Sequence, residues 1–229
     1  MKGILSSVFL VFLTTLCANS QTDTALVDVN FKFTDGLYVD AEQLRTNRPE
    51  VRFNILAGNL IVQEEDFLLK VENLHPQGRP DMPLPLDKVD FMVVNGLPYI
   101  QAYQDEERDF TVYSGLRVRG KLCYFAYSQN QADTILIKAY NPVNGIPFRQ
   151  QNVVRDREQL VEKVLDLTNG EVVDYNLDNL LQLFEEDPAL IKSLTSLPEE
   201  EAQKRLQRCL LIYDDRHPIY LPAAEPLTN

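Results

Sequence analysis

The sequence predicts an α+β fold, with an antiparallel β-rich first part followed by a C-terminal helical segment. Two observations support this class. Short apolar runs with a period of two recur up to about residue 150, as in antiparallel strands. From Leu177 onward the apolar residues follow a helical period instead. We therefore expect a signal peptide over residues 1–20, a β-rich part over 21–150 and, over 151–229, a hairpin with helices packed on it. The β-rich part would form a sheet, a sandwich or a partial barrel, and the two parts one compact unit.

The N-terminal segment has the three regions of a secretory signal peptide. Lys2 supplies the positive charge, Ile4–Leu16 is an uncharged apolar run of 13 residues, and Ala18-Asn19-Ser20 places small residues before a cleavage point. The run is too short for a membrane anchor, which needs about 20 apolar residues. Cys17 suggests a lipoprotein alternative, but leucine precedes it where lipidation needs a small residue. We expect export to the periplasm, the cell envelope or the medium.

In the front half, the alternation of apolar and polar residues from Val27 to Phe33 predicts a strand. Asp40 is a suitable N-cap for a short helix over residues 41–46, which Pro49 would end. Further strands are expected over residues 53–56 and 67–71, with a proline-rich loop over 75–85.

The middle of the chain gives the strongest β signal. Asn95-Gly96 separates two apolar runs, and this pair favours a hairpin because both turn positions need a positive φ angle. Leu97-Pro98 extends the link, so we expect a turn of more than two residues. More strands are expected over 110–113, 116–118, 122–127 and 134–140, with turns at 119–121 and 128–132. Residues 159–164 fit a helical turn or a strand, and residues 165–175 fit a hairpin around Thr168-Asn169-Gly170.

Three helices are expected at the C-terminal end. Asn176 would cap the first and Asp187-Pro188 would begin the second. Pro198 and the three glutamates after it would begin the third, because acidic residues favour a helix N-terminus. One face of this helix is an apolar stripe made of Ala202, Leu206, Cys209, Leu210 and Tyr213. Cys123 and Cys209 both lie in apolar patterns, so they are core thiols or a disulfide pair.

Charge and motifs exclude several classes of function. The chain has 22 basic and 34 acidic residues and a net charge of −12, which disfavours nucleic acid and anionic lipid surfaces as partners. Outside the N-terminal segment, no window is apolar enough for a transmembrane segment. There is no Gly-x-Ser-x-Gly, phosphate loop or dinucleotide fingerprint, and no Cys-x-x-Cys or His-Glu-x-x-His metal motif. Asp105-Glu106-Glu107 lacks the spacing and glycine of a calcium loop. We predict no catalytic residue, cofactor or metal ligand.

The densest polar cluster is Tyr213, Asp214, Asp215, Arg216 and His217. Two carboxylates and an imidazole could bind a cation or transfer a proton. The same residues also suit the end of a helix, where basic side chains meet the last carbonyl groups and Pro218 stops the chain from continuing. We favour the helix end and retain the cluster as a candidate surface site.

Six segments spread over most of the chain form a recognisable pattern. They are Asp35-Gly36-Leu37-Tyr38 with Leu44, Asn47 and Pro49; Asn95 to Ile100; Gly120-Lys121-Leu122; Leu165 to Gly170; Asp187 to Leu190; and Tyr213 to Pro218. Together they resemble an uncharacterised family of exported bacterial envelope proteins. The family ends in a Tyr-Asn-x-Arg-Asn-Pro pattern, where this chain has Asp214 and His217 at the asparagine positions. Asparagine cannot transfer a proton, so this departure argues against a catalytic role of the cluster. The resemblance implies export and a similar architecture, and it implies no activity.

The first functional hypothesis is an exported, non-catalytic envelope protein that binds a protein or cell-surface partner. The alternatives are a hydrolase that uses carboxylates, on glycans for example, and a small-ligand carrier with a barrel-like cavity. The first predicts a docking surface, the second an acid of raised pKa in a cleft, and the third an apolar pocket.

Overall fold

The computed structural model of the chain describes residues 24–105, 108–140, 142, 145 and 147–224. The signal peptide expected over residues 1–20 lies outside this part, as do Glu106 and Glu107 of the acidic triplet. Among the described helices, none combines the length and the apolar character that crossing a membrane requires.

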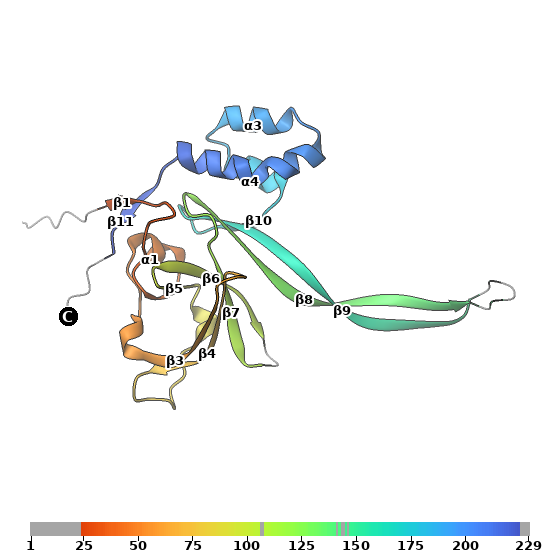
Figure 1. Cartoon of the computed structure of the whole chain (residues 1–229), viewed down its shortest axis with the longest axis horizontal. Helices are drawn as coiled ribbons and strands as arrows, with labels where there is room; N and C mark the ends of the chain where they lie inside the picture. The colour runs from red at the N-terminus through yellow and green to blue at the C-terminus, as the bar shows by residue number, and fades with distance from the viewer. Residues whose placement is uncertain (1–23, 106–107, 141, 143–144, 146, 225–229) are drawn as a thin grey trace, which may run out of the picture.

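The first part is a six-stranded antiparallel sheet that curls into a half-barrel (Figure 1). Its strand order is β2 (Gly36–Tyr38), β5 (Phe91–Val94), β6 (Leu97–Asp105), β7 (Phe110–Gly115), β4 (Leu68–Pro76) and β3 (Leu56–Gln63). One α-helix, α1 (Ala41–Thr46), and two 3₁₀ turns, η1 (Phe53–Ile55) and η2 (Leu86–Lys88), lie in its connections. Strands β2 and β3 are the two edges of this sheet.

The second sheet is dominated by one long hairpin. Strands β8 (Leu122–Tyr140) and β9 (Pro147–Asp166) pair antiparallel from end to end, and β10 (Val172–Asp174) pairs with the last residues of β9. Figure 1 shows the hairpin projecting far beyond the rest of the molecule. We call its projecting part, residues 129–159, the arm.

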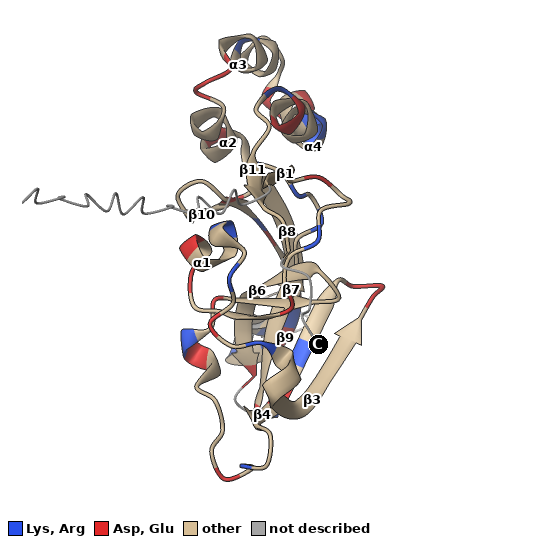
Figure 2. Cartoon of the chain, turned by 90° about the vertical axis from the view of Figure 1, so that its left-hand side faces the viewer, with Lys and Arg blue, Asp and Glu red and all other residues tan. Residues whose placement is uncertain are grey.

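The chain then folds into three helices, α2 (Leu177–Leu183), α3 (Pro188–Thr195) and α4 (Glu199–Arg216). They form a separate layer above the base of the arm (Figures 1 and 2). The last strand, β11 (Tyr220–Pro222), returns to pair with β1 (Thr24–Leu26), so both ends of the described chain lie together on the half-barrel. The sequence prediction of an α+β protein, with β structure first and helices last, is confirmed.

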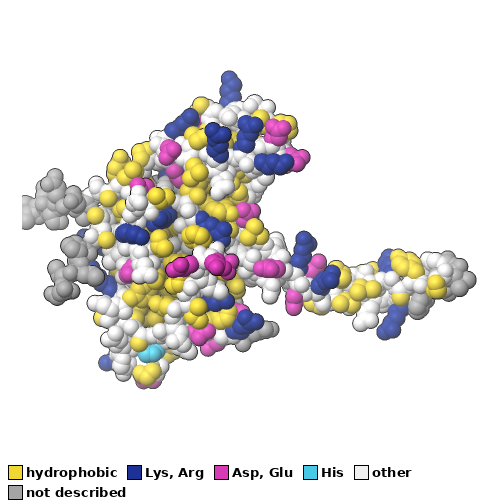
Figure 3. All heavy atoms as spheres, in the orientation of Figure 1, with side chains coloured by type: hydrophobic (Ala, Val, Ile, Leu, Met, Phe, Trp, Pro, Cys, Tyr) yellow, Lys and Arg dark blue, Asp and Glu magenta, His cyan; other side chains and the backbone are white. Residues whose placement is uncertain are grey.

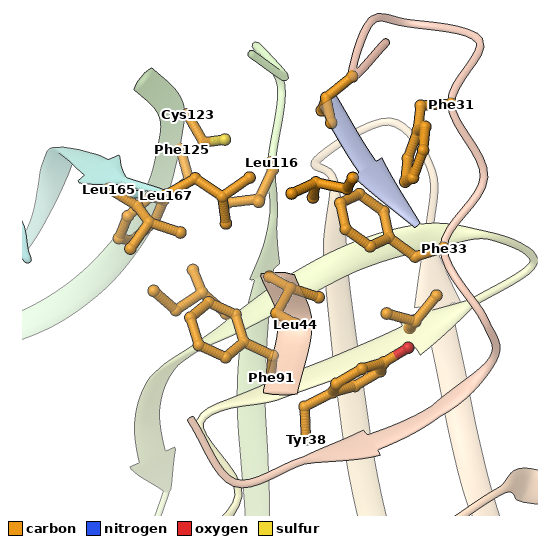
Figure 4. Close-up of a cluster of buried hydrophobic side chains, with 14 of the residues drawn as sticks. Phe31, Phe33, Tyr38, Leu44, Phe91, Leu116, Cys123, Phe125, Leu165 and Leu167 are labelled. Atoms are coloured by element: carbon orange, nitrogen blue, oxygen red, sulfur yellow. The ribbon is translucent and has the colours of Figure 1, made fainter. Parts of the chain in front are cut away.

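Two cores meet at the base of the arm because side chains alternate along a strand. From β8, Cys123 and Phe125 point to one side, into a core shared with Phe33, Tyr38 and Phe91 of the half-barrel (Figure 4). Residues on the other face of the same strands, Leu122 and Val164, join a second core made by the three helices. A third core fills the opposite face of the half-barrel.

Local signals were predicted well. Asp40 Oδ1 accepts a hydrogen bond from the Gln43 N–H, and Asn176 and Asp187 cap α2 and α3 in the same way. The hairpin expected around Thr168-Asn169-Gly170 joins β9 to β10. The turn at Asn95-Gly96 is shorter than expected: Val94 pairs directly with Leu97, and both turn residues have positive φ angles.

Three strand predictions were wrong. Val27–Phe33 is not a strand, because the Asp28 carboxylate accepts hydrogen bonds from the N–H groups of Asn30 and Phe31 and closes a turn. Residues 116–118 form a bend, and residues 53–55 form η1 before β3 begins. The turn expected at 128–132 does not exist, because β8 runs through it. The change of character placed near residue 150 accordingly falls inside β9.

Candidate functional site: the β8–β9 arm and its base

The base of the arm is held on both faces. The half-barrel core covers one face through Phe125 and Leu165, and the helical core covers the other through Leu122 and Val164. All four side chains are buried. The direction of the arm is therefore fixed by packing where it leaves the body, by which we mean the half-barrel and the three helices.

Beyond its base the arm has no cover. From Gln129 to Gln159 no side chain that the structure describes is buried. The free part of β8, Gln129 to Tyr140, is about 40 Å long at the usual rise per residue. A two-stranded ribbon of this kind is marginally stable by itself in water, so a partner that covers it would add stability.

We call residues 134–154 the outer arm. Both of its faces carry exposed apolar side chains. Thr134 pairs with Val154 and Ile135 with Val153 across the ribbon, and neighbouring pairs face opposite sides. The larger exposed side chains of the outer arm are Leu136, Ile137, Tyr140 and Val154, each with about half or more of its surface accessible. Figure 3 shows these yellow patches interrupted by basic side chains. Exposed apolar surface of this kind is typical of interaction sites.

The charge of the outer arm is opposite to that of the chain. Residues 134–154 contain Lys138 and Arg149 and no acidic residue, whereas the whole chain has a net charge of −12. The acids of the arm, Asp133, Asp156 and Glu158, lie nearer the body. The outer arm is thus apolar and weakly basic, and it stands away from an acidic body.

The predicted polar cluster lies where α4 meets the base of the arm. Asp214 Oδ1 accepts a hydrogen bond of 2.9 Å from the Leu122 N–H at the start of β8. Its Oδ2 is buried and has no hydrogen-bond partner among the described residues. A Cβ atom at position 120 would lie 2.5 Å from that oxygen, so Gly120 makes room for the carboxylate. Asp214 therefore joins the helical layer to the arm.

Burial changes the acidity of this carboxyl group. It raises the pKa of Asp214 to about 7, an effect that the neighbouring Asp215 carboxylate increases and the N–H groups of Leu122 and Lys121 oppose. Asp90 is the other described carboxyl group with a raised pKa, also through burial. The carboxyl group that takes up this proton therefore lies in the contact between α4 and the start of β8, which we call the joint.

A second group of side chains surrounds Tyr213 of α4. The His217 ring stacks on Tyr213 with centroids 4.3 Å apart. The Tyr213 hydroxyl accepts a hydrogen bond from Lys121 Nζ and donates one to Glu186, and Lys121 also forms an ion pair with Glu186. This pair lowers the pKa of Glu186. These contacts tie α4 to the segment before α3 and to the β7–β8 loop.

Helix α4 ends at Arg216, and the His217 N–H donates to the Tyr213 carbonyl. The Arg216 side chain, expected to meet the last carbonyl groups of its own helix, contacts another helix instead. Arg216 forms a 2.7 Å ion pair with Asp187, whose other oxygen accepts a hydrogen bond from the Leu190 N–H and caps α3. The structure thus brings Tyr213, Arg216 and His217 together with Lys121 and Glu186, whereas Asp214 contacts Gly120 and Leu122. Asp215 is exposed. The geometry is that of a structural joint between layers.

No group of three His, Cys, Asp or Glu side chains within the described residues is placed to hold a metal ion. Cys123 and Cys209 are both free and buried, in the half-barrel core and the helical core respectively. Burial raises the pKa of the Cys123 thiol to about 12, so this thiol stays protonated and unreactive at neutral pH.

Two of the surface clefts on the body bear on the alternative hypotheses. The more apolar one has a volume of about 500 Å³ and is lined by Phe33, Phe53, Asn95 and Gly96 among others. The other, of about 360 Å³, has Asp28, Arg119, Asp214 and Asp215 among its lining residues. Because Asp214 Oδ2 is buried, the unpartnered oxygen is not presented to this cleft.

No family model, no curated protein and no solved structure matches this chain. The function of the chain is therefore inferred from its own surface and chemistry.

Sequence reasoning did not identify the arm as a site, since it divided β8 into two short strands. One signal was present in the sequence. Residues 134–154 combine β-branched residues, two basic residues and no acid in an otherwise acidic chain. Such a run is typical of a ribbon that is exposed on both faces and binds a partner.

Proposed function

We propose that this chain is an exported, non-catalytic protein of the cell envelope that binds a protein partner through its β8–β9 arm. The observation that carries the proposal is a ribbon about 40 Å long that is packed at its base and uncovered on both faces beyond it. Folding alone gives no reason to expose Leu136, Ile137 and Val154 there. A partner that buries these side chains would explain their exposure in the free chain.

Export is the second element of the proposal, and the signal-peptide pattern of residues 1–20 supports it. The acidic net charge fits a surface that repels anionic lipid and nucleic acid, so the partner is a protein surface.

A shortened arm tests the proposal. Residues 131–157 are removed, and Asn130 is joined through Asn-Gly to Glu158, the residue that it faces across the ribbon. The size of the complex containing the chain is then measured by native electrophoresis of a gentle extract of the host. We expect the natural chain to migrate in a complex and the shortened chain to migrate alone. Equal migration of the two, with the shortened chain folded, would overturn the proposal.

The second candidate function is a small-ligand carrier, which the apolar cleft of about 500 Å³ favours. Native mass spectrometry of the chain purified from its own host tests this directly. A small molecule bound one-to-one, and lost when Phe53 is replaced by aspartate, would support the carrier. A bare chain would exclude a tightly bound ligand and leave the docking function as the sole candidate.

A further inference from the structure

The body carries an unprotected sheet edge that matches the arm. Strand β3 is an edge of the half-barrel and pairs only with β4 within the described part of the chain. Its eight residues, Leu56–Gln63, include no charged residue and no proline. Natural edge strands are usually protected by charge, by proline or by being short. A bulge between Ala57 and Asn59 disturbs one end, and the rest of the strand is regular.

Exposed apolar side chains accompany this free edge. Ile61 has 47% and Val62 39% of its surface accessible, and the two side chains lie on opposite faces of the sheet. An edge with free N–H and C=O groups and apolar side chains on both faces can accept an added strand. The partner strand that suits it is extended, apolar and free of acidic residues.

The chain itself contains such a strand in Thr134–Lys138 of β8. This segment is also an edge, because among the described strands β8 pairs only with β9. It has three consecutive branched aliphatic residues, one lysine and no acid. In Figure 1 the arm points away from β3 and β4 of its own body, so it can reach the β3 edge only of another molecule.

We infer that the arm of one copy adds to the β3 edge of a second copy, which gives head-to-tail self-association. This inference rests on the proposed function and names the partner of the arm. Residues 134–138 of one copy lie beside residues 59–63 of the next, so the sheet of the half-barrel gains β8 and, beyond it, its partner β9.

Charge sets the direction of the added strand. Strand β3 leads into the acidic turn Glu64-Glu65-Asp66. Parallel addition places Lys138 beside this turn, whereas antiparallel addition would place Asp133 there. Opposite charges attract and like charges repel, so the parallel arrangement is selected. The tip of the arm then points toward the acidic turn of the next copy.

Such a contact joins two different surfaces, so every pair of copies keeps one free arm and one free edge. It therefore continues from copy to copy, whereas pairing of two arms would stop at a dimer. A mixture of two single variants, one altered in the arm and one in the edge, therefore distinguishes the head-to-tail contact from pairing of two arms.

The test uses Ile61→Lys at the edge and Ile137→Lys in the arm, both at sites about half exposed in the monomer. Val29→Lys, at a site 66% exposed and outside both surfaces, is the matched control. The new charges have the same sign, so the two altered surfaces cannot pair with each other. Sedimentation velocity measures the assembly state of the full exported chain over a range of concentrations.

We expect the natural chain and Val29→Lys to form species larger than a dimer, and each of the two surface variants to associate at least about tenfold more weakly. An equal mixture of the two variants should form dimers and stop, because only one intact arm and one intact edge remain per pair. A monomeric natural chain would overturn the inference. So would an Ile61→Lys variant that assembles like the natural chain.

These results are distinguishable from failure of the proposed function. If the natural chain is monomeric and its arm is still required for a complex with a different protein in the host, self-association is refuted and the docking function stands.

Discussion

Gly120 and Asp214 are in contact across the joint between the arm and the helical layer. The carboxylate lies against the glycine so closely that a Cβ atom at position 120 would come within 2.5 Å of Asp214 Oδ2. Its other oxygen accepts the Leu122 N–H at the first residue of β8. This contact joins α4 to the residues that lead into the base of the arm.

Replacing Gly120 by alanine should therefore destabilise the chain by about 1–3 kcal/mol, because the buried carboxylate has to move. Urea unfolding of the purified chain measures this change. In an Asp214→Ala background the same replacement should cost much less, since the group that it collides with is gone. An equal cost in both backgrounds would show that the contact is not the cause.

The stability of the chain should fall as the pH rises toward neutrality, and Asp214 is the reason. Its pKa is about 7 when folded, against an ordinary value of 3.8. Between those values the folded state holds the proton that the unfolded state has lost, so stability decreases with increasing pH and levels off above the folded pKa. From about pH 5 to about pH 8 this effect amounts to about 2–3 kcal/mol.

Asp214→Asn checks this prediction because the amide oxygen can still accept the Leu122 N–H while the titrating group is removed. We expect its free energy of unfolding to change little between about pH 5 and about pH 8, and to exceed that of the natural chain at the upper end. Asp215→Asn, at an exposed site on the same helix turn, is the control and should keep most of the pH dependence. A natural chain without that dependence would contradict the assignment.

Removing the arm should leave the body intact. All three cores lie in the half-barrel, the helices and the arm base, and no described side chain from 129 to 159 is buried. The shortened variant joined at Asn130 and Glu158 should therefore unfold within about 1 kcal/mol of the natural chain. Thermal or urea unfolding measures this. A cost of several kcal/mol would show that the arm belongs to the folded core.

The sequence predicted features that depend on a few adjacent residues. The N-caps Asp40, Asn176 and Asp187 and the turn at Asn95-Gly96 all use local hydrogen bonds or local φ preferences. Val27–Phe33 shows the limit of periodicity, because the side chain of Asp28 bonds to the following N–H groups instead.

The arm and its joint could not be predicted in the same way. Residues 128–132 are mostly polar, which suits a turn and equally suits a ribbon exposed on both faces. The bond between Leu122 and Asp214 joins positions 92 residues apart, and no local pattern indicates such a partner. The cluster at 213–217 was recognised, but its division into two sets of contacts, one around Tyr213 and one around Asp214, follows from packing.

Site-specific photo-cross-linking in the living host tests the docking role of the arm most directly. A photoreactive residue at Val154, 64% exposed on the outer arm, is compared with one at Val29, 66% exposed on the body. We predict a discrete cross-linked protein from position 154 and none from position 29. Its mass would show whether the partner is a second copy or a different protein. The absence of a product from position 154, or equal products from both positions, would contradict the account.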